Sequence, residues 1–373
     1  MAAERARASR QLATVEQLRE RIDASHRRFV AEHRQSNSLR RLLRHYLVRL
    51  RRTEAELARR VIAERRLKLD QLGTAIKIAR RRGVLPPAAD RAARLLSVSP
   101  DYAAAVARWR AGEVPADIRR MRLGHLDWWV PPLTSDALGR QILDRRQLAL
   151  DSLLATRQFA VGGVMLDIGA GIGAACIPRV ALGEFGQAFA AEPGGDNYLC
   201  LVGNTLENVL EGCVLPHRVA ISGVAGTDRA RWCGGIDAED VPALTLDDWV
   251  RQLDAPPYDV RFVRVALRDW NINVLDGAPN LLKLRHIVWQ IEIDSTTLKS
   301  GTAPLDGFCR RVETHFTHIK ELGRYWIPQW RPSSQIGVVL SEVRETRRPL
   351  NLLLFNMRRD IARTSKALSH SDN

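Results

Sequence analysis

The sequence predicts an α/β protein whose parallel, doubly wound sheet carries helices on both faces and follows a basic helical region. Three observations predict this fold. From about residue 163, short apolar runs alternate with helical patterns at the pace of a parallel sheet. A glycine-rich turn directly follows the first apolar run. The first 83 residues instead consist mostly of helix-forming Ala, Arg, Glu and Leu.

The chain has 373 residues and a formal charge of +15, which is concentrated at one end. Residues 1–83 hold 23 Lys and Arg against 9 Asp and Glu, whereas the other 290 residues hold 34 against 33. No Pro or Gly precedes Gly73, and Pro86 and Pro87 end the helical pattern. We therefore expect a basic helical arm over 1–83, with coiled-coil spacing in its second half.

Three kinds of partner are compatible with this arm. Self-association of solvated helices into a homo-oligomer is the interpretation that we favour. Peripheral contact with an anionic surface, such as lipid headgroups, is the second. Nucleic acid is disfavoured because Phe29 and Tyr46 are the only aromatic residues of the arm, which leaves no stacking platform for bases.

Three further regions follow the arm. Residues 84–135 are expected to form a helical linker and docking segment, in which Trp128 and Trp129 pack in preference to lining a sugar platform. The sheet domain is expected over 136–300, and a helical and apolar extension with a polar tail over 301–373. Strands are expected from 164 and over 187–193, 217–223, 259–267 and 286–294, and helices over 135–158, 196–210, 243–253, 273–282 and 305–322.

The cysteine content and the lack of long apolar segments in the sequence indicate in which cellular compartment the protein is found. The five cysteines form no C-x-x-C pair, and the charged first 30 residues lack the apolar run of a secretory signal. No stretch approaches the roughly 18 apolar residues of a membrane span. We expect a reduced, cytoplasmic protein without a transmembrane segment.

The strongest chemical signal is the turn that follows the first strand. Gly169, Gly171 and Gly173 stand at alternate positions, which lets the backbone turn tightly and approach a ligand closely. Asp167 ends the strand, and Glu192 ends the next one, where a carboxylate can bind both ribose hydroxyls of a nucleoside. An NAD site is disfavoured because the third glycine comes one residue too early for the dinucleotide pattern.

Several segments of the chain resemble FkbM-type methyltransferases over about residues 164–295. After the turn LDIGAGIG come AAEP, VGNTLENV with Asn204 and Asn208, RVAISG, TLDDW, NVLDGAPNLL and VWQIEI, in the order found in that family. The resemblance implies a Rossmann-like class I fold and S-adenosylmethionine as methyl donor, held by Asp167, the three glycines and Glu192. It also implies O-methylation of a small-molecule or glycan acceptor: a sugar, polysaccharide or natural-product hydroxyl.

One stretch departs from the family's pattern. The family usually carries Lys-x-Asp-x-Glu-Gly-x-Glu where this chain has Arg264 to Asn271, with Ala266 at the position of the Asp. General-base catalysis needs a group that can accept the hydroxyl proton, and Asp269 is the candidate for a relocated base. Alternatively, alignment of donor and hydroxyl supplies most of the rate. A third interpretation is a non-catalytic scaffold, or one that only binds the donor, whose basic arm assembles a partner complex.

Weaker signals concern single side chains. His315 and His318 lie three residues apart on the expected helix without a Cys or carboxylate at ligand spacing, so we expect no metal site. Cys176 is expected to be a small buried hydrophobe and not a nucleophile. Glu292 closes a strand at the edge where such sheets bind ligands, and it is a second candidate for the acceptor site.

Overall fold

In the computed structural model, the part of the chain that can be described lies between residues 99 and 356. All of it belongs to one of two compact units, which spans residues 66–324 and 328–373. The predicted arm over 1–83 and the candidate base Asp269 lie outside the described residues. The described ranges are 99–132, 137–148, 156, 160, 162–229, 240–253, 257–267, 272–293, 303–322, 330–346 and 349–356.

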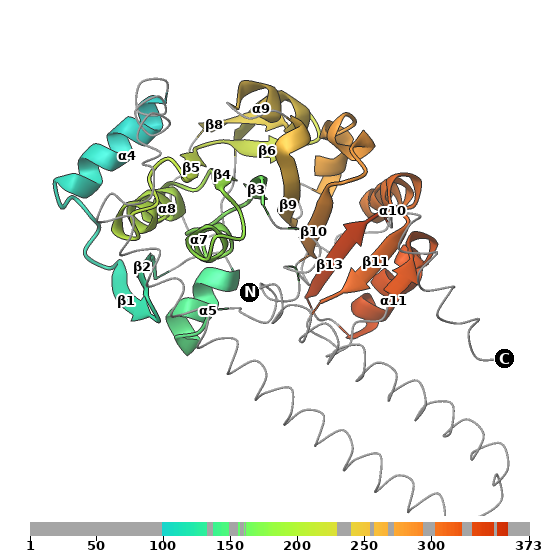
Figure 1. The fold of residues 1–373 in the computed structure, drawn as a ribbon, viewed down its shortest axis with the longest axis horizontal. Helices are drawn as coiled ribbons and strands as arrows, with labels where there is room; N and C mark the ends of the chain where they lie inside the picture. Colours follow the sequence, from blue (N-terminus) through green and yellow to red (C-terminus); the bar gives the residue numbers. More distant parts are fainter. Residues whose placement is uncertain are drawn as a thin grey trace, which may run out of the picture. The chain divides into compact units, whose positions relative to one another are not determined.

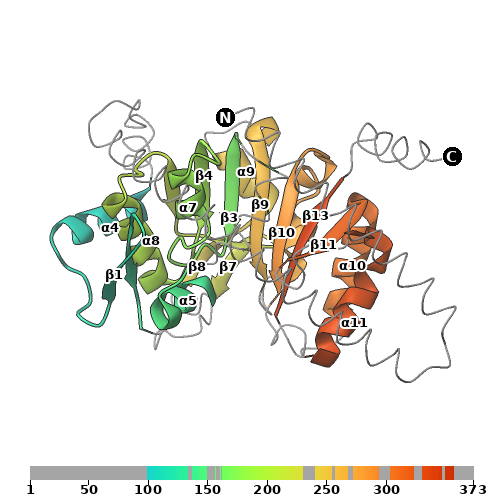
Figure 2. The ribbon, with the colours of Figure 1, turned by 60° about the horizontal axis from the view of Figure 1, so that its bottom comes forward.

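An eight-stranded sheet, visible in Figures 1 and 2, forms the centre of this unit. In spatial order its strands are β12 (Trp330–Pro332), β11 (His318–Glu321), β13 (Leu350–Phe355), β10 (Val288–Ile293), β9 (Val260–Leu267), β3 (Val164–Ile168), β4 (Gln187–Ala191) and β5 (Val214–His217). Strands β5, β4, β3, β9 and β10 are parallel, and β13 runs antiparallel between β10 and β11. This order confirms the predicted α/β, Rossmann-like fold.

Helices connect and cover the strands. They are α4 (Pro100–Arg110), α5 (Ala137–Arg145), α7 (Cys176–Ala181), α8 (Gly195–Glu207), α9 (Leu246–Gln252), α10 (Ala303–His315) and α11 (Ile336–Thr346). Shorter 3-10 turns are η1 (Pro257–Asp259), η2 (Ile272–Gly277), η3 (Leu281–Lys283) and η5 (Ser333–Gln335). A small sheet of β6 (Ala220–Ser222), β8 (Asp240–Thr245) and β7 (Gly226–Arg229) lies between β5 and α9 along the chain.

The large sheet separates two apolar cores. Successive side chains of a strand point to opposite faces, and β3 shows this directly. Leu166 and Ile168 pack in one core, whereas Met165 packs in the other together with Phe262 of β9. Because both faces are covered, the parallel strands are mostly apolar, which made them recognisable in the sequence.

The start of α9 shows why the run TLDDW forms a helix end. Thr245 accepts a hydrogen bond from the Asp248 N–H at 3.1 Å and donates its hydroxyl to Asp248 Oδ2 at 2.6 Å, a reciprocal cap. Asp247 accepts bonds from the N–H groups of Asn280 and Leu281 at 2.7 and 3.2 Å. The helix predicted over 243–253 is thus confirmed from Leu246, and Asp247 and Asp248 lie in its first turn.

Within the described residues of the expected helical linker, only α4 is an α-helix. After α4 the chain forms an antiparallel hairpin of β1 (Arg119–Leu123) and β2 (Leu126–Val130). Trp128 is fully buried, and Trp129 packs edge-on against Trp109 with ring centroids 5.1 Å apart. The two tryptophans are therefore packing residues, and the sugar platform is not formed.

The C-terminal part also differs from expectation. The helix predicted over 305–322 ends at His315, and His318 begins β11, so the two histidines do not share a helix face. Strands β11, β12 and β13 belong to the large sheet, so residue 300 is not a boundary of the sheet. The helix predicted over 273–282 is instead two 3-10 turns on either side of Pro279, because proline disfavours a continued α-helix.

Candidate functional site

The turn after β3 has the backbone conformation that its glycines permit. Gly169, Gly171 and Gly173 have φ angles of +70°, +59° and +86°, a region that residues with a Cβ rarely adopt. A Cβ on Gly173 would lie 2.6 Å from Ile177 Cδ1 and 2.8 Å from Leu201 Cδ1. The third glycine is therefore required both by its conformation and by the closeness of its neighbours.

This turn lies where the order of strands in the sheet reverses. From β3 the chain proceeds to β4 and β5 on one side, and later to β9 and β10 on the other. Open parallel sheets bind ligands outside the carboxyl ends of their strands at such a switch point. Asp167 and Glu292 lie near the carboxyl ends of β3 and β10, and Glu192 directly follows β4. The sheet thus brings three candidate carboxylates to one edge.

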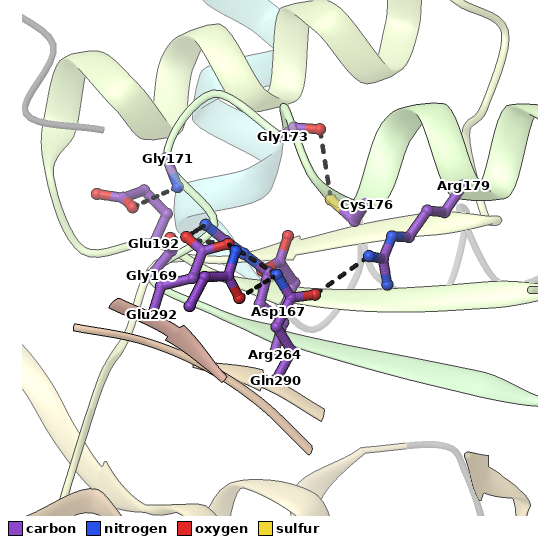
Figure 3. A network of polar contacts seen from close by, with 11 residues as sticks. Asp167, Gly169, Gly171, Gly173, Cys176, Arg179, Glu192, Arg264, Gln290 and Glu292 are labelled. Atoms are coloured by element: carbon purple, nitrogen blue, oxygen red, sulfur yellow. Dashed lines mark hydrogen bonds and ion pairs between the residues drawn. The ribbon is translucent and has the colours of Figure 1, made fainter. Parts of the chain in front are cut away.

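Glu192 connects the glycine turn to the start of α8, as Figure 3 shows in part. Its Oε2 accepts a hydrogen bond from the Gly171 N–H at 2.7 Å, and its Oε1 accepts one from the Gly194 N–H at 2.9 Å. The side chain is buried. One carboxylate therefore fixes two backbone segments at the carboxyl edge of the sheet.

Behind the turn, Arg264 of β9 lies between two carboxylates (Figure 3). Its Nη1 donates to Asp167 Oδ1 at 2.7 Å. Its Nε and Nη2 donate to Oε1 and Oε2 of Glu292 at 3.2 and 2.7 Å. Asp167 and Arg264 are 0% and 1% exposed, so the pair is shielded from water. Only a guanidinium offers this fork of donors, so the Arg is not equivalent to the family's Lys.

Arg264 was not predicted from the sequence to be the centre of a site. Its position in the mostly apolar strand VRFVRVAL could have revealed it, because a charged side chain in a buried strand requires a partner of opposite charge. Its partners come from neighbouring strands: Asp167 of β3 is in register with Arg264, and Glu292 of β10 lies two residues beyond Gln290, which is in register with it.

The polar network continues across β10 towards β13. Gln290 Nε2 donates to Glu292 Oε1 at 2.9 Å and to Asn351 Oδ1 at 3.1 Å. On the other side, Arg179 of α7 donates from Nη2 to Gln290 Oε1 at 3.1 Å. A continuous set of polar side chains therefore extends from the glycine turn across three neighbouring strands to β13.

Burial changes the acid–base properties of two groups beside this network. It lowers the pKa of the Arg179 guanidinium to about 10, with the charge of Glu184 acting in the opposite direction. Burial also raises the pKa of the Cys176 thiol well above its usual value, and the nearby Asp167 carboxylate raises it further. Cys176 is thus a buried neutral thiol, as predicted, and not a nucleophile.

A partly buried histidine ends the neighbouring strand β5. His217 packs between the rings of Phe189 and Trp249, whose centroids lie 5.9 and 5.8 Å from its own. Burial lowers its pKa to about 4, so the imidazole is neutral at physiological pH. Its backbone oxygen accepts a hydrogen bond from the Glu192 N–H at 3.0 Å.

The position at which the sequence lacks the family's Asp lies directly beside the turn. Ala266 of β9 is in register with Glu292 of β10, and its Cβ would be 3.3 Å from a Cβ on Gly169. The predicted donor residues are thus gathered at one edge, Glu292 lies among them, and Asp269 falls outside the described residues.

Metal and membrane signals are absent from the described part of the chain. There, no group of three or more His, Cys, Asp and Glu side chains could hold a metal ion. Within the same residues, no helix combines the length and apolarity needed to cross a membrane.

Comparison with known proteins gives low similarities. No family model and no curated protein matches the sequence. A crystal structure of the methyltransferase FkbM from Methylobacillus flagellatus KT is 15% identical with a TM-score of 0.36, over 53% of this chain. The chain thus matches only 44% of that protein's length.

Two other methyltransferase structures give similar values. The tRNA m1G37 methyltransferase of M. jannaschii is 13% identical with a TM-score of 0.35, over 65% of this chain and 58% of its own. The precorrin-6y C5,15-methyltransferase of Geobacter metallireducens GS-15 is 13% identical with a TM-score of 0.32, over 60% of this chain and 93% of its own. Likeness at this level identifies neither the family of this chain nor its substrate.

Proposed function

We propose that this protein is an S-adenosylmethionine-dependent methyltransferase. The observation that carries the proposal is the bond between Glu192 and the Gly171 N–H, which sets a carboxylate against a glycine turn at the sheet's switch point. When bound, S-adenosylmethionine supplies a methyl group on a sulfonium, an electrophile that a hydroxyl can attack.

The residues present fit this donor. Each carboxylate oxygen can accept more than one hydrogen bond, so Glu192 can accept from ribose hydroxyls as well as from its two N–H partners. The glycines leave the turn without side chains where the ligand approaches. Asp167, buried behind the turn and paired with Arg264, contributes by holding the end of β3 in place.

For the acceptor we propose a hydroxyl of a sugar, polysaccharide or natural product. The proposed acceptor rests on the resemblance of the sequence to FkbM-type enzymes and not on the geometry of the site. Asp269 is the proposed base, since it is the one acidic residue in the altered stretch from Arg264 to Asn271. Its carboxylate would accept the hydroxyl proton as the methyl group is transferred.

A specific observation favours the scaffold alternative. Position 266 is an alanine, and the nearest carboxylate across the register, Glu292, accepts hydrogen bonds from Arg264 and Gln290. Both oxygens of Glu292 are thus already engaged by donors of the chain itself. In that alternative the basic arm, which we propose to self-associate, assembles a partner complex on a domain that transfers no methyl group.

Methyl transfer from labelled S-adenosylmethionine to a panel of glycans and hydroxylated small molecules tests the proposal. We expect product with the wild-type protein, and a loss of turnover without a loss of donor binding in Asp269→Ala. Gly171→Val should abolish donor binding because valine is strained at a φ of +59°. Donor binding without product on any acceptor would favour the scaffold alternative.

A further inference from the structure

Two asparagines near the C-terminal end of α8 hold the hairpin by its backbone. Asn204 Oδ1 accepts from the Trp129 N–H at 2.6 Å, and its Nδ2 donates to the Trp129 carbonyl at 3.1 Å. Asn208 repeats the pattern with Asp127, at 3.0 and 2.7 Å. Both amides are buried, with 0% and 2% of the residue exposed.

The spacing of helix and strand explains this arrangement. Residues four apart on a helix rise by about 6 Å. Residues two apart on a strand are separated by about 6.6 Å. Asn204 and Asn208 therefore match Trp129 and Asp127, and their amides take the place of a neighbouring strand along one edge of β2. The other edge of β2 pairs with β1.

The two asparagines differ in their remaining hydrogen bond. Asn204 Nδ2 also donates to the carbonyl of Ile172 at 3.0 Å. Ile172 lies between Gly171 and Gly173, inside the proposed donor-binding turn. Asn208 Nδ2 instead donates to the backbone oxygen of Asn204, within the helix, at 2.8 Å. The Asn204 amide thus connects the hairpin to the turn.

The turn is thus held from two directions. Glu192 accepts from the Gly171 N–H, and Asn204 donates to the Ile172 carbonyl two peptide groups further along. Glycines have many accessible conformations, so an unrestrained turn would lose conformational entropy when it binds a ligand. Bonds that fix the turn beforehand remove that cost and raise affinity.

We infer that Asn204 is a positioning residue of the donor site, and that through it the hairpin β1–β2 is part of that site. This inference rests on the proposed function, because donor affinity is its main consequence. Of the two asparagines, Asn204 makes a hydrogen bond to the turn, so donor affinity should depend more on Asn204 than on the neighbouring Asn208.

The test compares Asn204→Ala with Asn208→Ala, since each amide holds one residue of β2 by the same pair of hydrogen bonds. Urea unfolding measures stability, and calorimetry measures the Kd for S-adenosylhomocysteine. We expect similar losses of stability, a rise in Kd of about tenfold for Asn204→Ala and less than about twofold for Asn208→Ala. Equal changes in Kd for the two variants would overturn the inference.

Hydrogen exchange of the wild-type amides keeps the test decisive if either variant fails to fold. Added S-adenosylhomocysteine should slow exchange at the Trp129 amide and leave the Asp127 amide unchanged; equal effects would contradict the inference. If the wild type binds no donor, the proposed function fails. The positioning role is then judged by exchange at Gly171 and Gly173, which should be faster in Asn204→Ala than in Asn208→Ala. Equal rates there would refute it.

Discussion

Arg264 and Asp167 form a buried ion pair with a distance of 2.7 Å between Nη1 and Oδ1, across the two strands where the sheet reverses its order. The guanidinium also binds both oxygens of Glu292 on the next strand. Three strand ends below the glycine turn are therefore joined by one side chain. The desolvation of these charges is tolerated because each has a close partner of opposite charge.

Removing the arginine should leave buried carboxylates without their main partner. We expect Arg264→Met to lower the free energy of unfolding by about 3–5 kcal/mol. Arg264→Lys keeps the charge but not the fork of donors, so its loss should be smaller. As a control, Arg311→Met breaks an exposed pair with Asp276 and should cost at most about 1 kcal/mol. Urea unfolding measures all three, and wild-type stability of Arg264→Met would contradict this account of the pair.

Two glycine substitutions should separate the cost of backbone strain at positive φ from the cost of close contacts made by an added Cβ. Gly173→Ala combines a φ of +86° with contacts below 3 Å, so it should destabilise by more than the roughly 1–2 kcal/mol of left-handed strain alone. Gly162→Ala has a φ of +78° and nothing within 4 Å of its Cβ, so it measures that strain. Thermal and urea unfolding should show that Gly173→Ala is less stable than Gly162→Ala. The reverse order would show that the side chains of Ile177 and Leu201 move aside at little cost.

A third glycine offers the opposite effect. Gly307 lies inside α10 without a positive φ, and a Cβ added to it would meet nothing within 4 Å. Gly307→Ala should therefore raise the unfolding free energy by about 0.5–1 kcal/mol through helix propensity. Urea unfolding measures the change, and a destabilised variant would mean that the space above Gly307 is occupied.

Acid should destabilise the protein through His217. Its pKa falls from 6.5 to about 4 on burial, so the unfolded chain binds a proton that the folded protein does not. Its contribution is complete above pH 6.5 and is lost as the pH falls to 4, on the order of 3 kcal/mol in all. Across this window the wild type should lose about 3 kcal/mol more unfolding free energy than His217→Gln as the pH falls, because glutamine does not titrate. Parallel curves would show that His217 does not titrate in this way.

The sequence predicted those parts of the fold whose pattern is local. Strands β3, β4, β9 and β10 are apolar runs bounded by turns, and all four lie where they were expected. Strand β1 was missed because its residues RRMRL carry three arginines and none of its side chains is fully buried. Strand β11 was read as the end of a helix because its few residues continue the pattern of α10.

Within the site, the sequence identified residues but not their contacts. The glycines, Asp167 and Glu192 were recognisable because they belong to one short turn and the end of the next strand. The pairing of Asp167 with Arg264 depends on the register of strands that lie 97 residues apart in sequence, which no local pattern encodes. For the same reason Asn204 was seen as part of a motif, whereas its bond to Ile172 was not foreseen.

The donor site is the central claim, and Glu192 is the residue on which it depends most. Glu192→Gln keeps the size of the side chain but presents an amide N–H to one of its two N–H partners, so it should lose both the turn contact and ribose binding. We expect its Kd for S-adenosylhomocysteine to rise at least about tenfold. Glu207→Gln, on the partly exposed face of α8, should bind like the wild type.

Calorimetric titration of the full-length wild-type protein with S-adenosylhomocysteine, followed by Glu192→Gln under the same conditions, tests this claim most directly. The account predicts saturable binding in the micromolar range for the wild type and a clear loss for the variant. No binding to a folded wild-type protein, or equal binding by both proteins, would contradict it.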